Sequence, residues 1–228
     1  MKYDRAKVTV IIPAKNEGEG LERVIASVKR YASAVIVIDG HSTDATKQIV
    51  RTSGARWYLD HNKGRGEALR LGLAKAGTDV VVIVDADGSI GVPDIPKLVQ
   101  PVLDGQADLV IASRRTGGSF DTGPTLSSLL RSFGSDTMTY LVNCRYHTRL
   151  TDIIYAFRAI RRSVIPHLDL RSNGFTFDQE MVVSCLKRQY RVKEIPSREF
   201  ARQWGISKLR TLMGVSMFFR LLRQLYLE

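Results

Sequence analysis

The first half of the chain alternates short apolar runs with amphipathic segments. The runs rich in Val and Ile, which predict strands, lie at residues 8–12, 35–38, 79–84 and 108–112, and a further short strand is expected near residues 56–58. The segments with apolar residues at helical spacing lie at residues 21–30, 42–50, 66–76 and 93–103. Strands that alternate with helices of this length predict a three-layer α/β domain with a mostly parallel central sheet.

The second half has a different pattern. It predicts one or two amphipathic helices, a strand, a helix, an edge strand and a final amphipathic helix, at residues 126–142, 153–160, 177–188, 190–195 and 209–225. The last helix has a basic polar face, which is typical either of a helix packed on the sheet or of one that lies in a membrane interface.

Composition narrows the class of protein. The chain has 228 residues, of which 44% are hydrophobic and 25% charged, enough for a sizeable core. At roughly 100–200 residues per domain, we expect a single domain over residues 1–228. No apolar run reaches the roughly 18–20 residues that span a bilayer, and no signal peptide is recognisable. Two cysteines without metal-ligand spacing favour a cytoplasmic protein.

The net charge of +11 is unevenly distributed. Residues 1–113 contain 15 Lys and Arg against 14 Asp and Glu, whereas residues 114–228 contain 19 against 9. The second half is therefore expected to face an anion, which could be nucleic acid, a phosphorylated substrate or lipid headgroups. A well-solvated basic surface is the simpler alternative.

Acidic residues follow the predicted parallel strands. Glu17 comes after the first strand, Asp39 after the second, and Asp85 and Asp87 after the strand at residues 79–84. Ligands of open parallel sheets bind beyond these strand ends, and clustered carboxylates repel one another unless a cation compensates them. Oxygen ligands of this kind suit Mg²⁺ or Mn²⁺. We therefore expect Asp85 and Asp87 to hold a metal that bridges the protein to a diphosphate.

The motifs of other nucleotide-binding proteins are absent. The first strand is followed by neither a Gly-x-Gly-x-x-Gly fingerprint nor a P-loop, which disfavours a nicotinamide dehydrogenase or an ATPase. The segment Lys63-Gly64-Arg65-Gly66 is basic and flexible and precedes a predicted helix. It suits contact with a diphosphate at the helix N-terminus, although an ordinary basic turn would have the same composition.

Eight segments together carry a family resemblance. In chain order they are VIIPAKNE (10–17), DGHSTDAT (39–46), NKGRGEAL (62–69), DADGS (85–89), ADLVIASR (107–114), DIIYAFRA (152–159), FTFDQE (175–180) and RQWGISKL (202–209). The chain resembles family 2 GT-A glycosyltransferases, in the branch of dolichol- and polyprenyl-phosphate mannosyl- or glucosyltransferases. The resemblance implies a GT-A fold with amphipathic C-terminal helices, a nucleotide-sugar half at residues 1–113 and an acceptor half at residues 114–228.

The resemblance also implies roles for individual residues. The nucleotide-sugar would be held by Pro13, Ala14, Asn16, Glu17, Asp39, Lys63, Asp85, Ala86, Arg202 and Lys208. A Mg²⁺ or Mn²⁺ ion would bind Asp85 and Asp87, with Ser89 as a further ligand. The acceptor phosphate would bind Arg114, Arg131 and Ser135. The catalytic group would comprise Asp87, Arg114, Arg131, Asp152 and Glu180.

The implied reaction is inverting, metal-dependent transfer of mannose or glucose from GDP-mannose or UDP-glucose to polyprenyl or dolichyl phosphate. The protein would act peripherally at the cytoplasmic face of a membrane. Many relatives carry membrane-spanning helices that this sequence lacks, which leaves open a separate membrane subunit or a homo-oligomer.

Other functions remain open at this stage. A phosphate acceptor is largely ionised at neutral pH and needs no base, whereas a saccharide, lipid or small-molecule hydroxyl would need Asp152 or Glu180 as its base. A nucleic-acid-binding protein would use the basic half, but the aromatic residues there follow helical or core positions rather than a stacking pattern. A non-catalytic nucleotide-sugar-binding scaffold is disfavoured because Asp85 and Asp87 are both present.

Overall fold

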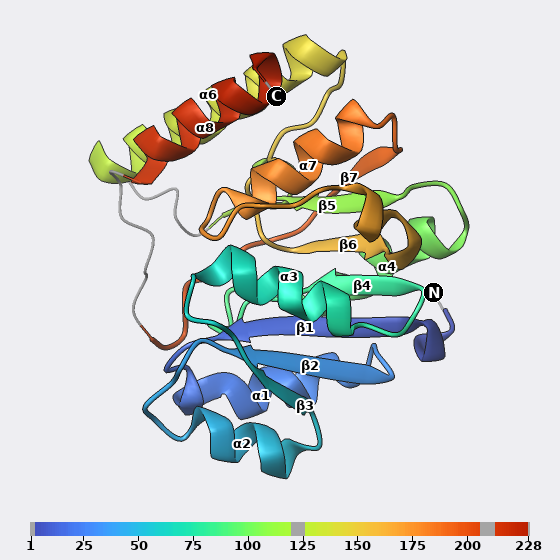
Figure 1. Ribbon diagram of the computed structural model, residues 1–228, viewed down its shortest axis with the longest axis vertical. Coiled ribbons are helices and arrows are strands. Elements are labelled where there is room, and N and C mark those ends of the chain that lie inside the picture. The colour runs from blue at the N-terminus through green and yellow to red at the C-terminus, as the bar shows by residue number, and fades with distance from the viewer. Residues whose placement is uncertain (1–2, 120–125, 206–212, 228) are drawn as a thin grey trace.

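One seven-stranded sheet organises the molecule. A computed structural model describes residues 3–119, 126–205 and 213–227, and Figure 1 shows the arrangement of its elements. The strand order is β3-β2-β1-β4-β6-β5-β7. The strands are β1 (Val8–Ala14), β2 (Ala34–Asp39), β3 (Arg56–Leu59), β4 (Val80–Ile83), β5 (Leu109–Ser113), β6 (Arg158–Arg161) and β7 (Val192–Pro196). All pairings are parallel except those of β6 with β4 and with β5.

Helices cover both faces of the sheet. The α-helices are α1 (Gly18–Val28), α2 (Thr46–Ser53), α3 (Arg65–Lys75), α4 (Ile95–Leu103), α5 (Arg114–Gly117), α6 (Leu126–Tyr146), α7 (Phe177–Lys187) and α8 (Met213–Tyr226). Short 3-10 segments lie at Arg5–Lys7, Val92–Asp94 and Arg162–His167. Val10 and Ile12 of β1 pack in one core cluster with α1, α2 and α4, whereas Ile11 packs in the other with α3, α6, α7 and α8. The predicted three-layer, mostly parallel α/β architecture is confirmed.

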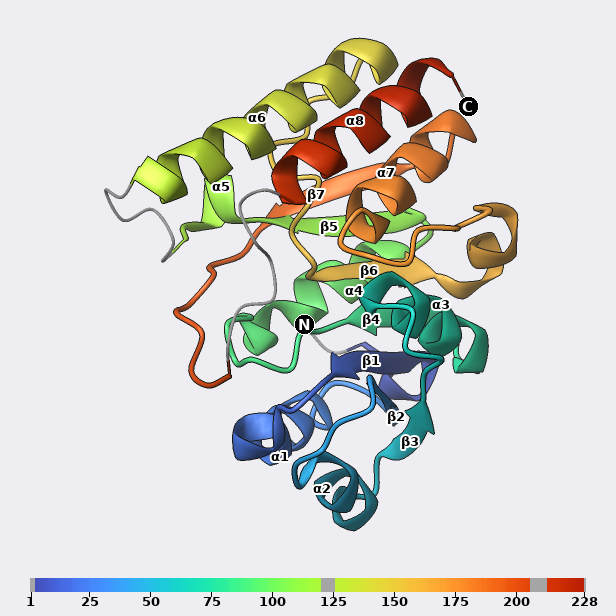
Figure 2. The same ribbon diagram turned by 60° about the vertical axis from the view of Figure 1, so that its left-hand side comes forward.

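The two amphipathic helices of the second half form an outer pair. Residues 126–146 form one helix, α6, rather than two. In Figures 1 and 2, α6 and α8 lie side by side and run in the same direction beyond α7. The inward face of α8 places Met217, Leu221 and Leu225 in the core. Among the described residues, no helix has the length and apolarity that a bilayer-crossing segment requires.

The predicted strand at residues 153–160 is mostly wrong, because β6 begins only at Arg158. The guanidinium group of Arg158 is fully buried and donates to the carbonyl oxygens of Ile153, Tyr155 and Ala156. Those carbonyl oxygens accept hydrogen bonds from the arginine side chain instead of from the backbone of a neighbouring strand. Residues 153–157 are apolar because they are buried around this arginine and not because they belong to the sheet.

The start of α2 also differs from the prediction. The helix begins at Thr46 rather than at residue 42, and the amide of Thr46 donates a hydrogen bond to the carboxylate of Asp44. Ser42 instead accepts a hydrogen bond from the amide of Asn16 and so joins the loop after β1 to the loop after β2. Gly54 ends the helix with φ of 71°, a left-handed conformation that glycine adopts readily.

Replacing Arg158 by Met should strongly destabilise the fold. Its Nη1 donates to the carbonyl of Asp178 at 2.6 Å, and its Nη2 lies 3.4 Å from the Asp178 carboxylate. Removing one partner of such a buried pair costs about 3–5 kcal/mol of unfolding free energy. Urea denaturation followed by circular dichroism would measure the loss. Arg191→Met is the matched control, since Arg191 pairs with Asp108 while 57% exposed, and similar losses for both variants would contradict the assignment.

Candidate functional site

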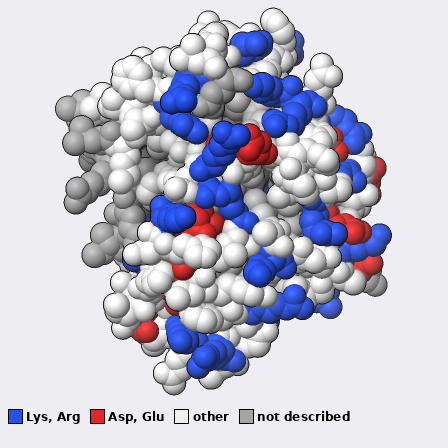
Figure 3. Space-filling view, in the orientation of Figure 1, with Lys and Arg blue, Asp and Glu red and all other residues white. Residues whose placement is uncertain are grey.

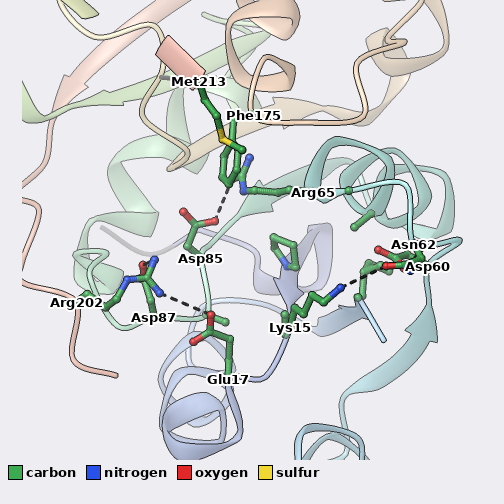
Figure 4. Close-up of a pocket in the computed structure, with 17 residues that line it drawn as sticks. Lys15, Glu17, Asp60, Asn62, Arg65, Asp85, Asp87, Phe175, Arg202 and Met213 are labelled. Atoms are coloured by element: carbon green, nitrogen blue, oxygen red, sulfur yellow. Dashed lines mark hydrogen bonds and ion pairs between the residues drawn. The ribbon is translucent and has the colours of Figure 1, made fainter. Parts of the chain in front are cut away.

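A pocket of about 340 Å³ lies beyond the carboxyl ends of β1, β2 and β4 (Figure 4). Its lining includes six residues that were predicted to hold the nucleotide-sugar, and Asp87, which was predicted to bind the metal: Pro13, Ala14, Glu17, Asp85, Ala86, Asp87 and Arg202. The other lining residues are Lys15, Ile38, Gly40, Asp60, Asn62, Gly64, Arg65, Ala68, Phe175 and Met213. The predicted residues come from the end of β1 and the loop after it, from the loop after β4 and from the segment before α8, which lie far apart in the sequence.

The loop after β4 presents two carboxylates to this pocket. Asp87 is bound from within its own loop, because its Oδ1 accepts from the amide of Ser89 at 3.0 Å and from the Ser89 hydroxyl at 2.7 Å. Its Oδ2 lies 2.9 Å from Nη2 of Arg202. The second oxygen of Asp87 is therefore the one that faces a partner from another segment.

Asp85 belongs to a chain of alternating charges. Its Oδ1 accepts a hydrogen bond from Nη2 of Arg65 at 3.0 Å, while Nη1 of the same arginine donates to Asp178 at 2.6 Å. Asp178 in turn contacts the buried Arg158. Burial alone would lower the pKa of the Arg65 guanidinium, but Asp178 and Asp85 outweigh it and raise the pKa above its usual value. Arg65 is therefore a permanent cation that joins the loop after β4 to α7.

A tryptophan fixes the segment that carries Arg202. The indole of Trp204 donates to the carbonyl of Ala86 at 2.8 Å. The ring packs against Gly20 of α1 and against Gly88, where a Cβ would lie 2.6 Å from the ring and φ is 73°. The amide of Gln203 donates to the carbonyl of Asp87 at 3.0 Å. Glycine at position 88 thus allows the close approach of the Trp204 ring.

Three of the predicted donor-site residues are not among those that line the pocket. Both oxygens of Asp39 accept internal hydrogen bonds, from the amide of Ser42 at 2.9 Å and from the indole of Trp57 at 3.1 Å. The side chain of Asn16 accepts from the amide of Thr43 at 2.8 Å. Lys63 is exposed between two residues that do line the pocket. Lys208 lies outside the described residues.

The N-terminus of α3 is occupied by another part of the chain. The amides of Gly66 and Glu67 donate to the carbonyl of Asn173 at 2.6 and 3.4 Å. A Cβ on Gly64 would lie 2.7 Å from the same oxygen. In this structure these two amides are not available to a diphosphate, because a loop from the second half already accepts their hydrogen bonds, and contact between a diphosphate and the other groups of the basic segment stays a prediction. The glycines permit that close docking.

The predicted acceptor residue Arg114 is held in a cluster of its own. Its Nε and Nη2 donate to the two oxygens of Asp152 at 2.6 and 3.1 Å. Its Nη1 donates to Glu199 at 3.5 Å, and its guanidinium lies 4.9 Å from the ring centre of Tyr155. Burial alone would lower the pKa of Arg114, but Asp152 and Glu199 raise it overall. Burial, with Glu199 nearby, also raises the pKa of the Tyr155 phenol, which stays protonated.

The remaining predicted residues lie on α6 and α7. Arg131 is half-buried on α6, and Ser135 is buried one turn further along. Among the described contacts, α5 is joined to α6 by Arg115, which donates to Asp136 at 2.8 Å. Glu180 accepts from the amides of Arg171 and Ser172 at 3.1 and 2.9 Å and so organises the loop that docks on α3. The structure does not bring Glu180 into the lining of the pocket.

The donor set suits a cation that is also bound by a second molecule. Within the described residues, no group of three or more His, Cys, Asp or Glu side chains is placed to hold a metal ion. Asp85 and Asp87 supply only carboxylate oxygens, and Mg²⁺ commonly combines one or two such groups with phosphate oxygens and water. The residues therefore fit a metal that arrives with a phosphorylated ligand.

Comparison with known proteins identifies the family. Residues 9–168 match glycosyl transferase family 2. The chain belongs to glycosyltransferase family 2. An uncharacterized glycosyltransferase of Mycobacterium tuberculosis is 31% identical over 202 residues, which cover 89% of this chain and 89% of that protein. The undecaprenyl-phosphate mannosyltransferase of Micrococcus luteus is 32% identical over 219 residues, which cover 89% of this chain and 87% of that protein.

A solved structure shares the fold of this glycosyltransferase. Glucosyl-3-phosphoglycerate synthase from Mycobacterium tuberculosis, in complex with phosphoglyceric acid, matches with a TM-score of 0.73 at 22% identity. The match covers 96% of this chain and 79% of the synthase. The predicted GT-A fold is thereby confirmed.

Sequence reasoning missed the contacts that Arg65, Asp178 and Asn173 make in this family 2 site. Arg65 and Asp178 each lie in a segment that carries the family resemblance, but they are 113 residues apart and neither segment signals that the two side chains pair. Asn173 acts through its backbone carbonyl, so its side-chain type carries no signal. The sequence feature that reflects the docking of this loop on α3 is the pair of glycines at positions 64 and 66.

Gly66→Ala should weaken the docking of the loop on α3. The added Cβ would overlap the carbonyl oxygen of Ser172 and lie 2.8 Å from that of Gly174. We expect a loss of about 1–3 kcal/mol in the free energy of unfolding, as for other overpacked sites, measured by urea denaturation. Gly174→Ala is the control, since a Cβ there meets no atom within 4 Å. Equal unfolding free energies for the two variants would show that the docking of this loop on α3 does not depend on glycine at position 66.

Proposed function

We propose that this glycosyltransferase moves a hexose, mannose or glucose, from GDP-mannose or UDP-glucose to a polyprenyl or dolichyl phosphate at a membrane surface. The reaction is a single in-line displacement that inverts the anomeric carbon. The observation that carries the proposal is the pocket itself. It begins at Asp85 and Asp87, and its wall includes Met213, the first residue of an outer helix with exposed apolar side chains.

The donor end of the pocket supports a nucleotide-sugar with a divalent metal, Mg²⁺ or Mn²⁺. Asp85 and Asp87 would hold the metal, which supplies positive charge to the departing diphosphate. Arg202 lies beside them, and Lys63 is exposed on the adjacent loop. A structure of the related synthase contains Mn²⁺, uridine diphosphate and glucosyl-3-phosphoglycerate, with a TM-score of 0.68. Ser89 acts chiefly by orienting Asp87 through its hydroxyl.

A phosphate acceptor agrees with the state of the two candidate bases. Both oxygens of Asp152 accept from Arg114, and both oxygens of Glu180 accept backbone amides. A general base must take up the acceptor proton, and hydrogen bonds that stabilise the ionised carboxylate make that step less favourable. A phosphate that arrives ionised avoids this step. Arg114, Arg131 and Ser135 would receive it.

Two relatives support a lipid phosphate as the acceptor. One is the Micrococcus luteus mannosyltransferase, which is named for undecaprenyl phosphate. The other is the UDP-N-acetylglucosamine–dolichyl-phosphate N-acetylglucosaminyltransferase of Methanococcus voltae, 25% identical over 240 residues that cover 94% of each chain. Their shared feature is an acceptor that joins a phosphate to an isoprenoid chain.

The outer helix pair offers a surface for such a lipid. Large apolar side chains on it are exposed, with Phe133 at 73% and Phe219 at 65%. The others on these helices are Leu129, Leu130, Tyr140, Met213, Val215 and Tyr226. Figure 3 shows Lys and Arg side chains spread from the α8 end down the middle of one face, with fewer acidic groups among them. Apolar side chains beside basic ones suit insertion at an anionic membrane surface.

Asp87→Asn should reduce sugar transfer by roughly three orders of magnitude, because metal charge stabilisation is worth several kcal/mol. The assay measures transfer of radiolabelled hexose from GDP-mannose and UDP-glucose to undecaprenyl phosphate with Mn²⁺.

In the same assay, Arg131→Ala should abolish transfer to the phosphate, whereas Asp152→Asn should keep appreciable activity. The reverse pattern, or transfer to undecaprenol instead, would show that the acceptor group is a hydroxyl.

The double variant Phe133→Glu/Phe219→Glu should bind vesicles of phosphatidylcholine and phosphatidylglycerol at least about tenfold more weakly, a change of about 1.4 kcal/mol. Co-sedimentation at low and high salt would measure it, because apolar insertion persists where charge attraction is screened. Leu59→Glu serves as control, since Leu59 is 44% exposed on β3, away from α6 and α8. Unchanged vesicle binding by the double variant would remove the helix pair as the membrane-facing surface.

A further inference from the structure

Each aspartate of the Asp85-Ala86-Asp87 motif forms an ion pair with an arginine, and each of these arginines also contacts a second carboxylate. Arg65 lies between Asp85 and Asp178. Arg202 lies between Asp87, at 2.9 Å, and Glu17, at 3.6 Å. Figure 4 shows both guanidinium groups beside the carboxylates in the pocket. The two arginines come from unrelated segments, the first turn of α3 and the segment before α8.

The pocket is close to charge balance with these pairs in place. Its acidic lining residues are Glu17, Asp60, Asp85 and Asp87, and its basic ones are Lys15, Arg65 and Arg202. A divalent cation alone would add positive charge beside two guanidinium groups that already neutralise its ligands. A cation together with a diphosphate would leave the balance nearly unchanged. Coulomb repulsion therefore disfavours the metal alone more than the metal with its anion.

We propose that Arg65 and Arg202 compete with the metal for Asp85 and Asp87, and that this competition couples metal binding to nucleotide diphosphate binding. The inference rests on the proposed metal and nucleotide-sugar site and assigns Arg65 and Arg202 as the positioning residues that produce the coupling. A cation that takes Oδ1 of Asp85 or Oδ2 of Asp87 displaces a guanidinium hydrogen bond. The diphosphate compensates, because a guanidinium pairs with phosphate oxygens through parallel hydrogen bonds.

The anchoring of each arginine makes the exchange local. Arg202 cannot leave the pocket easily, since Trp204 two residues later is fastened to Ala86 and packed against Gly20 and Gly88. Arg65 keeps its 2.6 Å hydrogen bond to Asp178 when its other nitrogen is released. Each guanidinium therefore needs only to turn from a carboxylate toward a nearby phosphate. By linkage, the metal strengthens nucleotide binding by the same factor that the nucleotide strengthens metal binding.

The test measures Mn²⁺ binding rather than turnover. Free Mn²⁺ is followed by electron paramagnetic resonance during titration of the protein alone and with UDP or GDP. In the unmodified protein, the nucleotide should tighten Mn²⁺ binding by at least about fivefold. Arg202→Gln should tighten binding of Mn²⁺ alone by about tenfold or less and should reduce the coupling factor. Arg65→Lys should act in the same direction, since a lysine cannot bridge Asp85 and Asp178 in the same planar geometry.

Arg191→Gln is the matched control, because it removes one arginine of an Arg–Asp pair at the start of β7, outside the pocket lining. It should leave Mn²⁺ binding unchanged, and thermal melting should show that all variants are folded. The inference is overturned if Arg202→Gln binds Mn²⁺ alone no more tightly than the unmodified protein does. It is also overturned if the control tightens binding equally. Loss of sugar transfer with every donor would contradict the proposed function but not this result, since Mn²⁺ binding is measured directly.

Discussion

The site depends on the row of alternating charges from Asp85 through Arg65 and Asp178 to Arg158. Arg158 is fully buried, and Asp178 is nearly so. Charges in such surroundings are tolerated only when each has a partner at short distance. The row therefore sets the spacing between the loop after β4, the start of α3, the first turn of α7 and the start of β6. A displacement of α7 relative to α3 or β6 would separate the buried Asp178 from Arg65 or from Arg158.

Local pattern was enough to predict most of the sheet. The strands β1, β2, β4 and β5 are covered on both faces by helices, so nearly every position in them is apolar and short runs of Val and Ile reveal them. The same logic failed at residues 153–157, where the carbonyl oxygens of Ile153 and Tyr155 accept hydrogen bonds from the buried guanidinium of Arg158. Apolar composition reports burial, and only backbone pairing distinguishes a strand from a buried loop.

The candidate site could be predicted only in part. The rule that ligands gather at the carboxyl ends of parallel strands placed Glu17, Asp85 and Asp87 correctly in one pocket. The same rule cannot tell that Asp39, also at a strand end, is satisfied by Ser42 and Trp57. Whether a carboxylate faces a ligand or its own chain depends on neighbours brought in by the fold. For Asp39 one of those neighbours, Ser42, is three residues away, and the other, Trp57, is 18 residues away.

The division of charge at residue 113 does not divide the pocket. Phe175, Arg202 and Met213 from the basic half line it together with the acidic residues of the first half. The carbonyl of Asn173 holds the N-terminus of α3, and the indole of Trp204 holds the loop that carries Asp85 and Asp87. The geometry of the carboxylates is thus set by contacts from the half that would receive the acceptor. An acceptor that moved this half would change the contacts that position Asp85 and Asp87. Acceptor binding and donor binding would then affect one another through these contacts.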